Sequence, residues 1–113
     1  MGDTVILVGP AELNSIILGA AQDEAHRLGF TIAAPAQDFL LTKSLPALNK
    51  ANEDGTLDAK RAKIESNTVD LIRFIVKENF EPSTAVREIT YQHLVAGLSV
   101  FCQHFPDWQP FCP

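Results

Sequence analysis

The side chains best suited to metal binding or nucleophilic chemistry gather near the C-terminus: His93, Cys102, His104 and Cys112. Imidazole and thiolate groups are the ligands that zinc prefers. Structural zinc sites usually present two close pairs such as Cys-x₂-Cys, and this chain has no such pair. Cys102 and His104 are two positions apart in a predicted helix and so point roughly 200° apart. We therefore predict no metal site and no other cofactor.

Nucleophilic catalysis finds little support in the sequence. Cys102 and a neighbouring histidine could form a thiolate–imidazole pair. Cys102 is expected near the C-terminus of a helix, however, where the helix dipole disfavours a thiolate. The chain has no Gly-x-Ser-x-Gly elbow, and neither a three-glycine dinucleotide fingerprint nor a Walker loop is present. The sequence thus predicts no catalytic set, which leaves enzymatic activity undecided.

The two cysteines are too few for the disulfide framework of a small secreted domain. Pro106 and Pro110 would turn the tail back, so a bond between Cys102 and Cys112 is one alternative. The favoured expectation is one buried thiol and one thiol held loosely near the chain end.

Length and composition indicate one folded domain over residues 1–113. The hydrophobic content of 46% is ordinary for a folded core. With 14 acidic and 9 basic residues the formal net charge is −5, which disfavours a nucleic-acid-binding surface. No apolar run approaches the ~20 residues of a membrane span, and no secretory signal is evident. These features predict a soluble cytoplasmic protein with neither a nucleic acid nor a membrane as partner.

The basic residues are unevenly placed. Five of the nine lie between positions 43 and 63: Lys43, Lys50, Lys60, Arg61 and Lys63. One interpretation is a docking site for an acidic partner or a phosphorylated ligand. The favoured interpretation is a solvated face, because interspersed acidic residues nearly cancel the positive charge.

The hydrophobic pattern predicts a mostly helical α/β fold. Short strands at 4–8 and 30–34 flank a helix at 10–28, which makes one βαβ unit with parallel strands. Pro10 fits the first helical position, and Gly29 is a typical helix stop. Three more helices are expected, at 36–51 with an interruption at Pro46, at 57–78 and at 84–105. No third strand is evident, so we expect dimerisation to complete the sheet.

The helix predicted at 84–105 is apolar around most of its circumference. One face would supply the internal core, with Tyr91, Leu94, Val95, Leu98, Phe101, Cys102 and Phe105. The other face and the aromatic tail at residues 106–113 form a predicted interface for a second subunit or a partner. Its residues are Val86, Ile89, His93, Gly97, Val100, Trp108 and Phe111. Gly97 would let another helix approach closely, and aromatic residues are common interface anchors.

Two functional hypotheses follow. The first is a small acidic soluble interaction protein, self-associating as a homodimer, that acts as an adaptor, an accessory subunit or an inhibitor or immunity-type partner of another protein. The alternative is a small-molecule-binding protein or small enzyme with a pocket between helices or at a dimer seam. Its candidate ligand-binding residues are His26, Asp38, Tyr91 and His93. The missing catalytic motif and the two-faced last helix favour the first hypothesis.

Overall fold

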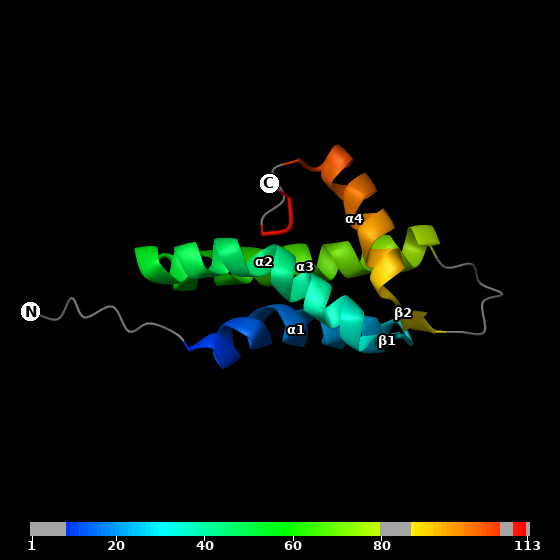
Figure 1. The fold of residues 1–113 in the computed structure, drawn as a ribbon, viewed down its shortest axis with the longest axis horizontal. Helices are drawn as coiled ribbons and strands as arrows, with labels where there is room; N and C mark the ends of the chain where they lie inside the picture. The colour runs from blue at the N-terminus through cyan, green and yellow to red at the C-terminus, as the bar shows by residue number, and fades with distance from the viewer. Residues whose placement is uncertain (1–8, 80–86, 107–109, 113) are drawn as a thin grey trace, which may run out of the picture.

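The computed structural model describes residues 9–79, 87–106 and 110–112. The elements follow the order α1 (Pro10–Arg27), β1 (Thr31–Ile32), α2 (Ala34–Asp54), α3 (Leu57–Asn79), β2 (Glu88–Ile89) and α4 (Tyr91–His104). Helices α1, α2 and α3 run alongside one another, and α1 packs most extensively against α3 (Figure 1). Helix α4 leaves the strands and tilts away from these three helices. The C-terminal turn, at residues 110–112, comes back toward them (Figure 1). None of the helices in the described ranges combines the length and apolarity that a membrane crossing requires.

The start and end of α1 confirm the prediction from sequence. Pro10 occupies the first turn, and the helix ends at Arg27. Gly29 then adopts a left-handed conformation with φ of 86°, which a side chain would oppose. The N–H of Phe30 donates a 2.7 Å hydrogen bond to the carbonyl oxygen of Ala25. Phe30 is buried, so the chain folds back onto the end of its own helix.

Helix α2 continues through Pro46, so the predicted interruption was wrong. Proline removes one backbone donor and usually bends or ends a helix. Pro46 lies on the exposed side of α2, whereas Leu40 and Leu48 on the two sides of it are fully buried. Burial of both halves against the same core holds the helix together. The helix ends only at Asp54, where Gly55 takes a left-handed φ of 74°.

The small sheet differs from the predicted one. Strands β1 and β2 pair in parallel, with Thr31 opposite Glu88 and Ile32 opposite Ile89. Strand β2 lies where a helix was predicted, so that assignment was wrong for residues 87–90. The connection between the two strands runs through α2 and α3. The predicted strand at 4–8 lies outside the described residues, and the βαβ unit built on it stays a prediction.

The core lies between the helices and beneath the strands. Its fully buried side chains include Ile17 of α1, Leu71, Ile72 and Ile75 of α3, and Ile89 of β2. Ile89 is therefore a core residue, because its strand places it against the helices. This burial provides a physical reason for the strand, since an apolar β-branched residue packs well on a pleated surface.

Candidate functional site

The exposed large hydrophobic residues of the described chain lie on α4 or at its C-cap. The exposed large hydrophobic residues are Tyr91 at 48%, Val95 at 41%, Val100 at 43% and Phe105 at 42% of their accessible surface. Three of them lie within α4, and Phe105 is its C-cap. The helix spans 14 residues, and none is Asp, Glu, Lys or Arg. Exposed apolar surface without charge is typical of contact sites between proteins.

A groove of about 390 Å³ separates α4 from α2, and we call it the α2/α4 groove. Its lining residues are Phe39, Lys43, Tyr91, Val95, Leu98, Ser99, Cys102 and Phe111. The ring of Tyr91 meets the ring of Phe39 edge-on, with centroids 5.2 Å apart. The ammonium group of Lys43 lies 5.7 Å from the centroid of the Phe39 ring. The groove therefore has an apolar aromatic wall with one cation beside it.

The buried face of α4 differs in part from the predicted one. Leu94, Gly97, Leu98 and Phe101 are its buried residues, and Phe101 packs on Phe74 of α3 with ring centroids 5.5 Å apart. Gly97 thus belongs to the contact of α4 with its own chain. The buried residues occupy one side of the helix, and Val100 lies outside that side.

The predicted interface residues do not form one exposed face. Ile89, Gly97 and Phe111 are buried by the chain itself, whereas Val100 is exposed and His93 is half-buried. Val86 and Trp108 lie outside the described residues. The sequence pattern identified α4 as a helix with surplus apolar surface. The pattern alone does not indicate which side of α4 the rest of the chain covers.

His93 helps α4 begin. The N–H of Thr90 donates to Nδ1 of His93 at 3.1 Å, and the N–H of His93 donates to Oγ1 of Thr90 at 3.3 Å. These two bonds form a capping box, in which two otherwise unsatisfied backbone donors are paired. The histidine stands where such boxes usually have Glu or Gln, and Thr90-x-x-His93 was the signal in the sequence.

The other predicted ligand-binding residues are dispersed. Tyr91 lines the α2/α4 groove. Asp38 is an exposed residue of α2, and His26 is exposed in the last turn of α1. His26, Asp38 and His93 line neither the α2/α4 groove nor the cavity described next. The four residues thus do not come together in either of these two hollows.

A second hollow, of about 450 Å³, lies between α2, α3 and the C-terminal turn. We call it the lysine cavity. Its lining residues are Ala47, Lys50, Ala51, Lys60, Lys63, Ile64, Asn67 and Pro110. Three of the five clustered basic residues thus surround one cavity. Lys50 also pairs with Asp54 at 3.6 Å, and both side chains are exposed.

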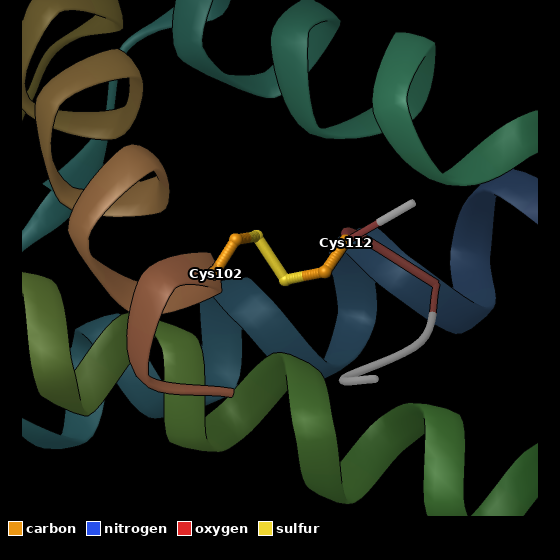
Figure 2. The surroundings of a disulfide bond; sticks show 2 residues. All are labelled: Cys102 and Cys112. Carbon is orange, nitrogen blue, oxygen red and sulfur yellow. A yellow bond between two sulfur atoms is a disulfide. The ribbon is translucent and has the colours of Figure 1, made fainter. Parts of the chain in front are cut away.

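Cys102 and Cys112 form a disulfide, with Cα atoms 5.4 Å apart (Figure 2). The favoured expectation of two unpaired thiols was therefore wrong. The bond joins the end of α4 to the C-terminal turn, whose residues Pro110, Phe111 and Cys112 are buried. Pro110 lines the lysine cavity, and Phe111 lines the α2/α4 groove. The turn is therefore part of the wall of both hollows. Burial of residues 110–112 against the rest of the chain places Cys112 beside Cys102.

An ion pair between a buried carboxylate and two exposed guanidinium groups joins α1 to α3. Glu24 is only 5% exposed, and Arg27 donates two hydrogen bonds of 2.7 Å to its carboxylate. Arg73 of α3 donates to the same carboxylate. The bonds from Arg27 lower the pKa of Glu24 to about 2, against the opposing effect of burial and with further help from Arg73.

The described residues contain no candidate metal site. Residues 9–79, 87–106 and 110–112 contain no group of three or more His, Cys, Asp or Glu side chains positioned to hold an ion. Comparison with known proteins adds no functional assignment: no family model, no curated protein and no solved structure matches this chain.

Proposed function

We propose that this chain is a small self-associating interaction protein whose contact surface is the groove side of α4. The observation that carries the proposal is the exposure of Tyr91 and Val95 on a helix without a single formally charged Lys, Arg, Asp or Glu residue. Beside them the α2/α4 groove offers a hollow for side chains of a partner.

The partner that fits this surface best is a second copy of the chain. The net charge of −5 makes two copies repel at long range. A contact helix without Asp, Glu, Lys or Arg lets them meet without burying a charged side chain of that helix, which would cost several kcal/mol. A two-fold arrangement also uses each apolar contact twice. Because one short helix offers a small interface, we expect association in the micromolar range.

A self-associated pair would serve as an adaptor, an accessory subunit or an inhibitor or immunity-type partner. These roles need a binding surface and no catalytic residues. The competing location for the contact is the Val100 side of α4, which the sequence pattern had favoured.

Two matched substitutions separate the two sides. Val95→Lys and Val100→Lys each place a charge on α4 at a residue of nearly equal exposure, 41% and 43%. Only Val95 lines the groove. Light scattering of the purified chain should give a mass above that of one chain for the native protein and for Val100→Lys. Val95→Lys should give the mass of a single chain.

Circular dichroism at the same concentrations checks that both variants keep their helices. If Val100→Lys dissociates the protein and Val95→Lys does not, the contact lies on the other side of α4. A single-chain mass for the native protein over the whole micromolar range would reject self-association.

A further inference from the structure

The lysine cavity has an apolar floor formed mainly by small residues. Ala51 and Ile64 are almost completely buried, and Ala47 is partly buried beside them. Small side chains on α2 leave the space that larger ones would fill. The volume of about 450 Å³ lies within the roughly 300–1,000 Å³ typical of ligand pockets. The floor thus suits an apolar group of a small molecule.

Three of the four polar residues that line the cavity, Lys60, Lys63 and Asn67, lie on one stripe of α3. Lys60, Lys63, Ile64 and Asn67 follow the i, i+3, i+4, i+7 spacing, so all four share a helix face. Asn67 is 2% exposed, and it offers amide hydrogen-bonding atoms at a buried position of the lining. The two lysines are exposed, so the stripe passes from cations at the surface to an amide in the interior.

The placement of these lysines brings like charges close together. Lys60 and Lys63 are three positions apart, where like charges on a helix repel. They also lie in the first two turns of α3, near the positive end of the helix dipole. Lys50 of α2 brings a third cation to the same rim, where Asp54 is its ion-pair partner. An anion at the mouth of the cavity would relieve the repulsion between these ammonium groups.

The C-terminal turn completes the wall. Pro110 lines the cavity, and Cys112, two positions later, is 2% exposed and bonded to Cys102. The disulfide thus fixes the turn where it closes one side of the apolar floor.

We propose that the lysine cavity is a binding site for a small amphipathic anion, with a carboxylate or phosphate head group at the lysines and an apolar chain on the Ala51 and Ile64 floor. The shared chemistry is a negative head on a hydrocarbon body. Lysine suits this arrangement because its stem covers apolar surface while its ammonium group stays in water. The site is distinct from the contact surface proposed for α4, and the C-terminal turn at residues 110–112 contributes to the walls of both hollows.

Calorimetric titration with four probes that each carry a ten-carbon chain tests the proposal on the full chain. Decanoate and decyl phosphate carry the two candidate head groups, decanol carries no charge, and decyltrimethylammonium carries a positive charge. We expect saturable binding of one or both anions at concentrations below roughly 1 mM. Decanol should bind at least about tenfold more weakly, and the cation should not bind. The tighter of the two anions identifies the head group.

Substitutions locate the site. The double variant Lys60→Gln/Lys63→Gln should weaken anion binding by about tenfold or more and reduce its dependence on salt. Lys77→Gln is the matched control on the same helix, away from the cavity, and should change the affinity less than about twofold. Ala47→Leu fills the floor with an apolar side chain and should block the cavity without removing charge. The pair Cys102→Ser/Cys112→Ser should weaken binding by releasing the wall.

Several results would overturn the proposal. These are the absence of saturable anion binding, equal affinities for decanol and decanoate, or an equal loss in Lys77→Gln and the double variant. Tight binding to anionic lipid vesicles without binding of monomeric decanoate would instead assign the lysines to a membrane surface. Unchanged affinity in the Cys102→Ser/Cys112→Ser pair would reject the disulfide-held wall.

Discussion

Replacement of Glu24 by Gln should lower the free energy of unfolding, because it removes the carboxylate that joins α1 to α3. The pKa of Glu24 falls from 4.5 to about 2 on folding, chiefly through the hydrogen bonds from Arg27. At roughly 1.36 kcal/mol per pKa unit this difference sets an upper value of about 3 kcal/mol. The Arg27 and Arg73 side chains are 59% and 55% exposed, so water screens part of the interaction. We therefore expect a loss of about 1–2 kcal/mol at neutral pH.

The pH dependence of this loss follows from the direction of the pKa change. A carboxyl group with a lowered pKa in the folded state contributes its full stability above its unfolded pKa. That contribution declines as the pH falls from 4.5 toward the folded pKa of about 2. The native protein should therefore lose its advantage over Glu24→Gln across this window.

Urea unfolding of both proteins at pH 7 and about pH 3 measures the difference. Asp23→Asn is the matched control, because Asp23 is the exposed neighbour of Glu24 on α1. The reasoning fails if Asp23→Asn destabilises the protein as much as Glu24→Gln does. It also fails if the gap between Glu24→Gln and the native protein stays constant from pH 7 to pH 3.

Two further predictions concern α4 and the tail. The Cys102→Ser/Cys112→Ser pair should unfold at lower urea, with a loss of about 2–3 kcal/mol, because the disulfide closes a loop between cysteines ten positions apart. Titration of the denatured, unreduced native protein should find no reactive thiol, and two thiols per chain would contradict the bond. Thr90→Ala should cost about 1 kcal/mol through loss of the α4 cap, whereas Thr90→Ser should retain the cap. Thermal unfolding compares these two variants, and equal melting temperatures for them would exclude a capping role of the hydroxyl group.

Local signals in the sequence located most of the helices. The pattern from Pro10 to Gly29 contained a start and a stop, and the structure has both. The helix predicted at 57–78 appears as Leu57–Asn79. Such elements depend on neighbouring residues alone, so their patterns can be recognised without knowledge of the rest of the fold.

Features that depend on distant contacts were not predictable in the same way. The strand at Glu88–Ile89 exists because β1 lies beside it, more than fifty positions away in the chain. Pro46 stays within α2 because tertiary packing outweighs its local preference. Glu24 is buried because Arg73 approaches from α3. No pattern of local spacing encodes these partners.

The candidate sites were also predictable only in part. The apolar excess of α4 and the cluster of lysines were visible in the sequence. The side of α4 that remains exposed, the cavity that joins three of the lysines and the turn that walls it required the fold. Cys102 and Cys112 illustrate the difference most clearly, since their pairing depends on where the tail packs.

Sedimentation equilibrium of the native chain tests the central claim of self-association through α4 most directly. The measurement covers concentrations from about 5 to about 500 μM, which span the affinity expected for a small interface. The average mass should rise from the 12.4 kDa of one chain toward twice that value. Val95→Lys should keep the mass at that of one chain throughout. A native protein that stays at 12.4 kDa at every concentration would contradict the account.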